Sequence, residues 1–236
     1  MMNIINVFLC VRNNENTLQT SLELLNNLEI KHSEYIFRYY IYENDSLDNT
    51  KKIIIDFFKN HSGSCVFETL HKKEWGNVKD INRTIDMSLY RNKMKSLCTH
   101  FKYSDFSIIL DTNITFDNNI LSQMINIFCK NENIQMITPF GFVKGKPKMY
   151  YDTFALDLES KCKGSNKKKL KYEMQKHNLV ELKSGFAGFI MIRTKTLQEC
   201  NWEYNKLTSE HNEFCKQVLM FGKIVCASNI KVCWKK

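Results

Sequence analysis

The chain has 236 residues, of which 43% are hydrophobic, 12% aromatic and 25% charged, the profile of one fair-sized globular domain. With only 2 Pro and 8 Gly and no internal repeat, the composition excludes fibrous and low-complexity proteins. No segment approaches the roughly 18 apolar residues of a membrane-spanning helix. The start, MMNIINVFLCVRNNEN, lacks the basic region of a signal peptide. We therefore predict a single domain over residues 1–236, with no membrane span.

The charge balance favours an anionic partner. The formal net charge is +9, from 34 Lys and Arg against 25 Asp and Glu. Nucleic acid, a nucleotide phosphate and a membrane surface are all candidates. Much of the excess lies at 161–176, KCKGSNKKKLKYEMQK, which we interpret as a solvated loop, a mobile lid or disordered chain over 161–178. The nine Cys are scattered without C-x-x-C spacing, which is typical of reduced thiols and predicts a cytoplasmic protein.

Strand and helix patterns alternate along the first part of the chain. Continuous apolar runs indicate strands that are buried on both faces, at 3–11, 35–42, 65–70, 106–110 and 134–140. Helical spacing of apolar residues predicts helices around 18–25 and at 48–60, 79–98 and 119–131. In the helix 79–98 we expect Ile81, Ile85, Leu89 and Met94 to face inward.

Four β-α units in succession predict an α/β fold, with a mostly parallel sheet and helices on both faces. Ligands of such sheets bind at the carboxyl ends of the strands. Polar clusters follow three of the predicted strands there: RNNEN after Val11, ENDS after Tyr42 and DTN after Leu110. We expect these clusters to converge on one site.

The second part of the chain is less regular. A segment at 148–160, KMYYDTFALDLES, precedes the basic stretch. An apolar strand with glycines is predicted at 184–194, a helix at 209–222 and a final strand at 223–234.

The residues at the strand ends suggest a metal and phosphate site. Asp111 and Asn113 could hold a divalent cation against a diphosphate, because hard cations prefer oxygen ligands; an Asx turn is the alternative. Arg91 and Arg12 could pair with phosphate, although an Arg on a helix is more often a surface ion pair. No G-x-G-x-x-G follows the first strand, which disfavours a dinucleotide site.

Further candidate residues carry carboxylates. Glu43 and Asp45 lie where an acid would accept hydrogen bonds from a ribose or a base. Glu210 follows Ser209, a helix cap, and could assist an acceptor hydroxyl as a general base or face a sugar. The alternative for Glu210 is a favourable interaction with the helix dipole.

Together these stretches carry a family resemblance. FLCVRNNENTLQTSLELL, YIYENDSLDNTKKII, an Arg-Asn pair on a helix and FSIILDTN resemble the nucleotide-sugar half of a GT-A glycosyltransferase. YYDTFAL, SGFAGFIMIRTKTL and SEHNEFCKQVLMFG resemble the fungal capsule-associated α-1,3-mannosyltransferase family and its relatives in microbes and large DNA viruses. The resemblance covers about residues 5–234, and for a viral protein it implies a place in the host cytoplasm or the virion.

The resemblance implies a GT-A fold, with residues 1–115 as the nucleotide-sugar half and 116–236 as the acceptor-side half. It implies transfer of a sugar from a UDP- or GDP-sugar to a hydroxyl of a glycan or glycoprotein, usually with Mn²⁺ or Mg²⁺. Asp111 and Asn113 would occupy the Asp-x-Asp metal motif, from which Asn113 departs, and fewer ligand charges should weaken the metal site.

Other roles follow from the same resemblance. Glu43 and Asp45 would contact the nucleoside and Arg91 the nucleotide, while His211 would be a metal or diphosphate ligand. Tyr151 and Asp152 would lie over the donor or acceptor sugar, with a strand bearing a surface Asp as the alternative. For Gly188, as for Gly185, close approach of a ligand and tight packing are equally favoured.

Three rival functions stay open at this stage. A nucleotidyltransferase shares the fold style, but no Gly-rich phosphate loop lies near the start of the chain. A basic nucleic-acid-binding protein would interleave aromatics with Lys on one surface, whereas the aromatics here fall mostly in strand patterns. A catalytically silent sugar-binding module is consistent with the Asn113 departure.

Overall fold

The structure, a computed structural model, describes residues 3–72, 75, 80–99 and 101–235. The first part of the chain forms β1 (Asn3–Val11), α1 (Glu15–Lys31), β2 (Tyr35–Asn44), α2 (Thr50–Phe57), β3 (Gly63–Glu68), α3 (Ile81–Ser96), a 3₁₀ turn at Phe101–Tyr103 and β4 (Ser104–Leu110). The second part forms β5 (Ile114–Phe116), α4 (Ile120–Lys130), β6 (Ile134–Val143), α5 (Asn166–Met174), β7 (Leu179–Leu182), β8 (Phe189–Arg193), α6 (Thr194–Glu199), α7 (Glu210–Val218) and β9 (Lys223–Trp234).

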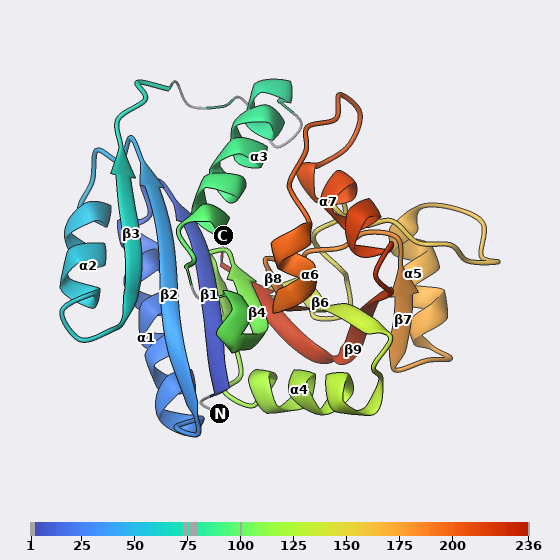
Figure 1. The fold of residues 1–236 in the computed structure, drawn as a ribbon. Helices are drawn as coiled ribbons and strands as arrows, with labels where there is room; N and C mark the ends of the chain where they lie inside the picture. Colours follow the sequence, from blue (N-terminus) through green and yellow to red (C-terminus); the bar gives the residue numbers. More distant parts are fainter. Residues whose placement is uncertain (1–2, 73–74, 76–79, 100, 236) are drawn as a thin grey trace.

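One sheet runs through both parts of the chain and is flanked by helices (Figure 1). Its strand order is β3-β2-β1-β4-β8-β6-β9-β5, with β7 paired to β9. β3, β2, β1 and β4 are parallel neighbours, as the alternation of strands and helices predicts. β8 is inserted antiparallel between β4 and β6, and no local pattern announces this insertion. The fold class, an α/β protein with a mostly parallel sheet, is confirmed.

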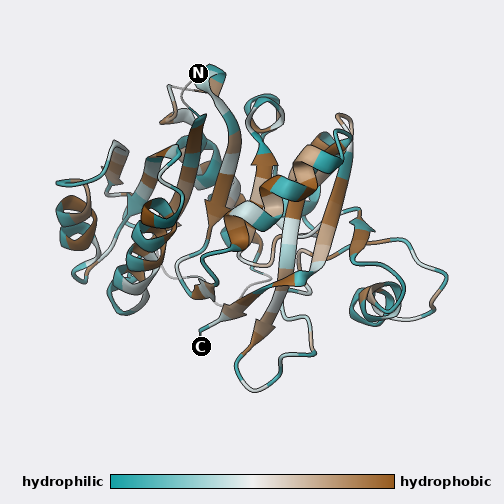
Figure 2. Cartoon of the chain, turned by 90° about the horizontal axis from the view of Figure 1, so that it is seen from below, coloured by the Kyte–Doolittle hydropathy of each residue, from teal (hydrophilic) through white to brown (hydrophobic). Residues whose placement is uncertain are grey.

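The core forms where the continuous apolar runs predict it. The side chains of β1 are buried from Ile4 to Leu9, and Phe8 stacks on Tyr40 of β2 with ring centroids 5.1 Å apart. The predicted helical stripe of α1 is also buried, at Leu18, Leu22, Leu25 and Leu28. Figure 2 shows this distribution, with largely brown strands and helices that carry both brown and teal residues.

Helix α3 presents a different face to the protein from the one predicted. Ile81, Ile85 and Leu89 are 40%, 41% and 47% exposed, so their predicted inward orientation is wrong, whereas Met94 is fully buried as expected. The buried face instead carries polar and aromatic residues, including Thr84, Ser88, Tyr90 and Arg91. An apolar stripe indicates the inner face only when the helix covers a hydrophobic core, and α3 lies partly over a polar cavity.

Two predictions for the second part of the chain need correction. The basic stretch interpreted as a loop contains helix α5, which is anchored by the fully buried Leu170. The strand predicted at 184–194 begins only at Phe189, because Ala187 and Gly188 adopt left-handed backbone angles, φ +59° and +74°, that end an extended strand. No helix in the described part of the chain is long and apolar enough to cross a membrane.

Candidate active site

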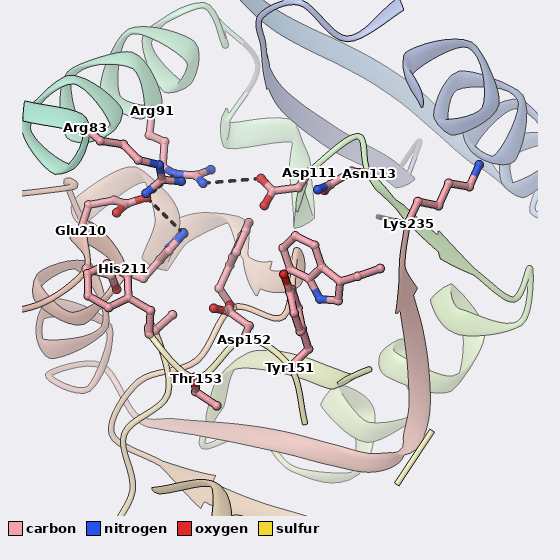
Figure 3. Close-up of a pocket in the computed structure, with 15 residues that line it drawn as sticks. Arg83, Arg91, Asp111, Asn113, Tyr151, Asp152, Thr153, Glu210, His211 and Lys235 are labelled. Carbon is pink, nitrogen blue, oxygen red and sulfur yellow. Dashed lines mark hydrogen bonds and ion pairs between the residues drawn. The ribbon is translucent and has the colours of Figure 1, made fainter. Parts of the chain in front are cut away.

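A cavity of about 470 Å³ lies at the carboxyl end of β4 (Figure 3). Segments far apart in sequence contribute to it: α3, the turn after β4, residues 151–155, the start of α7 and the end of β9. Its polar lining comprises Arg83, Arg91, Asp111, Asn113, Tyr151, Asp152, Thr153, Ser209, Glu210, His211 and Lys235. Seven of the eleven site residues predicted from sequence therefore meet in one place.

Arg91 lies between two carboxylates in this cavity. Its side chain is 3% exposed; Nη2 lies 3.5 Å from Asp111 Oδ1, and Nε donates to Glu210 Oε1 at 3.4 Å. The guanidinium carbon lies 4.8 Å from the centre of the Phe186 ring. Figure 3 shows the Arg91 side chain reaching from α3 toward both acids. A buried cation is retained when carboxylates compensate it, and this one connects α3, the end of β4 and α7.

His211 supports Glu210 from the other side. Its Nε2 lies 3.6 Å from Glu210 Oε1, and its Nδ1 accepts a hydrogen bond from the Trp202 indole N–H at 3.5 Å. Accepting at Nδ1 places the proton of a neutral imidazole on Nε2, from which it points at the carboxylate. Burial holds the pKa of His211 well below its usual value, and the charges of Arg91 and Arg83 lower it further. His211 is therefore neutral, and its Nε2 proton faces Glu210 from beyond hydrogen-bond distance.

Only one oxygen of the Glu210 carboxylate is used in this way. Arg91 and His211 both approach Oε1, whereas the buried Oε2 has no hydrogen-bond partner among the described residues. A buried acceptor without a partner costs free energy. Oε2 is thus available to a hydroxyl group of a bound molecule.

Asp152 is a third carboxylate in the cavity, beside Asp111 and Glu210, and it is tied to an unusual backbone turn. Its Oδ2 accepts a hydrogen bond from the N–H of Ala187 at 3.0 Å. Burial raises the pKa of Asp152 to about 6, opposed by that hydrogen bond and increased by the negative charge of Asp111. A carboxylate with such a pKa is ionised at neutral pH yet basic enough to accept a proton.

The turn Asp111-Thr112-Asn113 is held in place by its neighbours. The backbone N–H of Asp111 donates to Gly188 O at 2.8 Å, and the Ser21 hydroxyl donates to Thr112 O at 2.6 Å. β5 follows the turn directly and pairs with the end of β9, and the N–H of Lys235 donates to Asn113 O at 2.7 Å. The Asp111-Thr112-Asn113 turn is thus held in part by the end of β9 and by Lys235.

The oxygen donors of this turn fit a divalent cation in part. The Asp111 side chain is 29% exposed and lines the cavity together with Asn113, which suits a hard cation that takes its remaining ligands from water and phosphate. Burial raises the pKa of Asp111, while Arg91 and Arg83 oppose that rise. The described residues contain no cluster of three or more His, Cys, Asp or Glu that could hold a metal without such help.

The acids predicted to contact a nucleoside lie outside the cavity and are engaged by backbone. Glu43 is fully buried, and its Oε1 accepts the N–H of Ser46 at 2.8 Å. Asp45 accepts the N–H groups of Leu70 and His71 at 2.7 and 2.9 Å. These bonds brace the turns after β2 and β3, so a nucleoside role for Glu43 and Asp45 stays a prediction.

Arg12 and Gly188 also lie outside the cavity lining. The Arg12 side chain donates to Lys72 O at 2.5 Å and lies 5.7 Å from the centre of the Trp75 ring. At Gly188 a Cβ would come within 2.8 Å of Trp234 and 2.9 Å of Ile114. Packing therefore accounts for Gly188, one of the two alternatives raised from the sequence.

Several lining residues were not predicted. Arg83 lies on α3, and Trp234 and Lys235 reach the cavity from the end of β9. Tyr151 packs against Trp234 with ring centroids 5.3 Å apart and ring planes inclined by 55°, so the two aromatics form one wall. Arg83 lies two turns before Arg91 on the same helix, a spacing that places both on one face. Nothing local in the sequence connects the chain end with the turn after β4.

Comparisons with known proteins give a consistent fold. The sequence matches no protein-family model and no curated protein sequence. Among solved structures, residues 1–349 of TarS from S. aureus superpose with a TM-score of 0.64 at 11% identity, covering 99% of this chain and 60% of that one. The mannosyltransferase PcManGT from Pyrobaculum calidifontis, in complex with GDP-Man and Mn²⁺, gives 0.57 at 8% identity, covering 99% and 57%.

A third similar structure is glucosyl-3-phosphoglycerate synthase from Mycobacterium tuberculosis, solved with Mn²⁺, UDP and glucosyl-3-phosphoglycerate. It gives a TM-score of 0.55 at 10% identity, covering 100% of this chain and 72% of that one. This chain spans about three fifths of the length of the TarS and PcManGT chains. At such low identities the likeness concerns the fold. The protein has the GT-A glycosyltransferase fold.

Proposed function

We propose that this protein transfers a sugar from a nucleotide-diphosphate sugar to a hydroxyl group of an acceptor. The observation that carries the proposal is the Arg91 bridge, which gathers Asp111 and Glu210 at the carboxyl edge of the sheet. Similar structures with this fold were solved with UDP-GlcNAc and with GDP-Man. A cavity with cations and three differently placed carboxylates, Asp111, Asp152 and Glu210, suits a diphosphate leaving group and an attacking hydroxyl.

In this proposal the two parts of the chain divide the substrates. Residues 1–115 hold the nucleotide end of the donor, and residues 116–236 present the acceptor, a glycan or glycoprotein hydroxyl. The relation to the capsule-associated α-1,3-mannosyltransferases and their viral relatives, a mannosyl donor and a cytoplasmic location are hypotheses that rest on the sequence motifs alone.

The cationic side chains of the cavity would face the diphosphate. Arg83 and Lys235 line it together with Arg91, whose charge Asp111 and Glu210 already share. Asp111 and Asn113 would hold Mn²⁺ or Mg²⁺, which would supply charge neutralisation for the leaving diphosphate. His211, by its contact with Glu210, keeps that carboxylate oriented. Its predicted role as a metal ligand would need its Nε2 to turn away from Glu210.

The chemical step assigns different tasks to the two carboxylates. The bond between the sugar and the diphosphate breaks, the acceptor oxygen forms the new bond, and its proton passes to Asp152. Asp152 suits this task because its pKa of about 6 matches a general base at neutral pH. Glu210 would accept a hydroxyl of the sugar or acceptor at its unpartnered Oε2.

The proposal is tested by thermal unfolding with a panel of UDP-, GDP- and CMP-sugars, each with and without Mn²⁺. One nucleotide sugar should stabilise the protein in a metal-dependent way, and Asp111→Ala should remove that effect. Stabilisation without Mn²⁺ would retain the donor site and discard the metal role of Asn113. If no sugar nucleotide stabilises the protein or releases nucleotide diphosphate with an acceptor, the proposal is wrong.

The rival functions are not favoured by the comparisons. The TarS, PcManGT and glucosyl-3-phosphoglycerate synthase structures give no support to a nucleotidyltransferase or a nucleic-acid-binding protein. The basic stretch that raised the nucleic-acid reading lies in and around α5, away from the cavity lining.

A further inference from the structure

A second hollow, which we name the α5 groove, lies beside the candidate active site. It has a volume of about 640 Å³ and runs between α5, the segment 147–150 and the edge formed by β6 and β9. Its walls are largely apolar, with Phe140, Met149, Tyr150, Leu170 and Met174 among the lining residues. Phe140, Tyr150 and Leu170 are at most 4% exposed, so the floor belongs to the protein core and the groove is a built cavity.

The rim of the α5 groove is strongly cationic. Five lysines line it, Lys148, Lys167, Lys168, Lys171 and Lys231, and no Asp or Glu is among the described residues of its lining. None of the five forms an ion pair within the described part of the chain. The other face of the same helix differs, because Lys169 lines a separate hollow that contains Glu159 and Glu173. The uncompensated charge is thus concentrated at the apolar groove.

We infer that the α5 groove binds an anionic amphiphile, a molecule with an apolar chain and a phosphate-like head. An apolar floor removes hydrocarbon from water, which is favourable in proportion to the area buried. Five lysines without ion pairs at the rim attract negative charge, and no existing ion pair has to be broken when they contact an anion. An inorganic anion would leave the floor uncovered, and a neutral apolar ligand would leave the lysines without partners. Only a ligand with both parts matches both features.

The groove and the active-site cavity share a stretch of backbone. Met149 and Tyr150 line the groove, and the next two residues, Tyr151 and Asp152, line the cavity. An occupant of the groove would therefore lie close to the acceptor side of the cavity. The inference itself rests on the groove alone and holds whether or not the protein transfers a sugar.

The test is calorimetric titration of the whole protein with dodecyl phosphate below its micelle concentration. Inorganic phosphate and dodecyl maltoside serve as the head-only and the uncharged probes. Dodecyl phosphate should bind, and each of Lys167→Gln and Lys171→Gln should weaken binding about fivefold. Met149→Glu, at a 45% exposed wall residue, should also weaken it, through a like charge at the apolar wall. Lys169→Gln on the same helix is the matched control and should leave binding unchanged.

Thermal unfolding of each variant separates loss of binding from loss of folding. Equal binding of dodecyl maltoside, equal binding of inorganic phosphate, or an equal effect of Lys169→Gln would each overturn the inference, as would no binding of dodecyl phosphate. Sedimentation with vesicles of phosphatidylcholine containing phosphatidic acid distinguishes two supporting results. If the protein sediments with the vesicles and this depends on Lys167 and Lys171, the amphiphile is a lipid within a bilayer. If the protein binds dodecyl phosphate but not the vesicles, the amphiphile is a single molecule in solution.

Discussion

At the scale of single residues, Arg91 is held in the cavity by two carboxylates and the Phe186 ring. Replacing it by Met leaves the buried Glu210 and the neighbouring Asp111 without their shared cation. Removing one partner of a buried ionic group typically costs about 3–5 kcal/mol in the free energy of unfolding. We expect Arg91→Met to lose that amount in urea unfolding at pH 7.

Arg83→Met is the matched control for this prediction. Arg83 lines the same cavity from the same helix but forms no ion pair among the described residues. Its loss should cost about 1 kcal/mol or less. Equal destabilisation by the two substitutions would contradict the bridging role of Arg91.

The pKa of Asp152 predicts how the rate of sugar transfer depends on pH. Its carboxyl group is a base only when deprotonated, and its pKa is raised to about 6. The rate of sugar transfer at low substrate should therefore rise as pH increases through about 6 and then level off. Asp152→Asn should lower the rate by about 100-fold or more, while the thermal shift caused by the donor is retained.

Two results would contradict the role of Asp152 as the general base. Asn can still accept the N–H of Ala187, so the backbone turn is preserved in Asp152→Asn. A variant that keeps its activity, or a rate that does not change between pH 5 and 7, would show that another group accepts the proton.

His211 makes a spectroscopic prediction. Burial and two nearby arginines hold its pKa well below the usual value, and Trp202 fixes which ring nitrogen carries the proton. The ¹⁵N shifts of the His211 ring should therefore stay constant from pH 8 to pH 5.5, with Nδ1 unprotonated. Titration of His211 near pH 6.5 would contradict its neutral state.

At the scale of elements, the turn before β8 determines how the site is shaped. Gly188 has φ +74° and no room for a side chain, whereas Gly145 has φ +84° with nothing within 4 Å of an added Cβ. Gly188→Ala should destabilise the protein by about 3 kcal/mol from strain and overpacking together. Gly145→Ala should cost only about 1 kcal/mol, from backbone strain alone. The difference between the urea unfolding midpoints of Gly188→Ala and Gly145→Ala measures the steric clash at Gly188. Equal midpoints for the two variants would contradict that clash.

The elements also show where sequence patterns succeed and fail. β1 and the final strand β9 have the predicted bounds. For β1 the reason is that a continuous apolar run has few other solutions in a buried sheet. The orientation of α3 could not be predicted, since its inner face lines a polar cavity and the apolar Ile81, Ile85 and Leu89 are left outside. Helix α5 was missed because its lysines obscure the single buried anchor, Leu170.

At the scale of the whole molecule, the active-site cavity depends on contacts between the turn after β4, near the middle of the chain, and the end of β9. Ile114 pairs with Trp234 in the sheet, and Lys235 contacts Asn113. Removing residues 233–236 should therefore release the Asp111–Asn113 turn. We expect about a 100-fold loss of rate, together with loss of the metal-dependent thermal shift. Unfolding in urea should remain a single transition because β9 keeps residues 223–232 and the other strands keep their full length. A truncated protein with full activity would contradict this dependence.

The sequence by itself determined the order of most strands and helices, the fold class and the identity of seven residues that meet in the cavity. The order of elements, the fold class and the polar strand ends follow from local patterns of consecutive residues. Tyr151, Asp152 and His211 were instead predicted from the family resemblance. Only the tertiary structure decided which carboxylates share Arg91, that Glu43 and Asp45 accept backbone N–H groups of the turns after β2 and β3, and that five lysines border an apolar groove. Those arrangements arise from the insertion of β8 and the return of β9, and pairings between distant segments leave no periodic signal in the sequence.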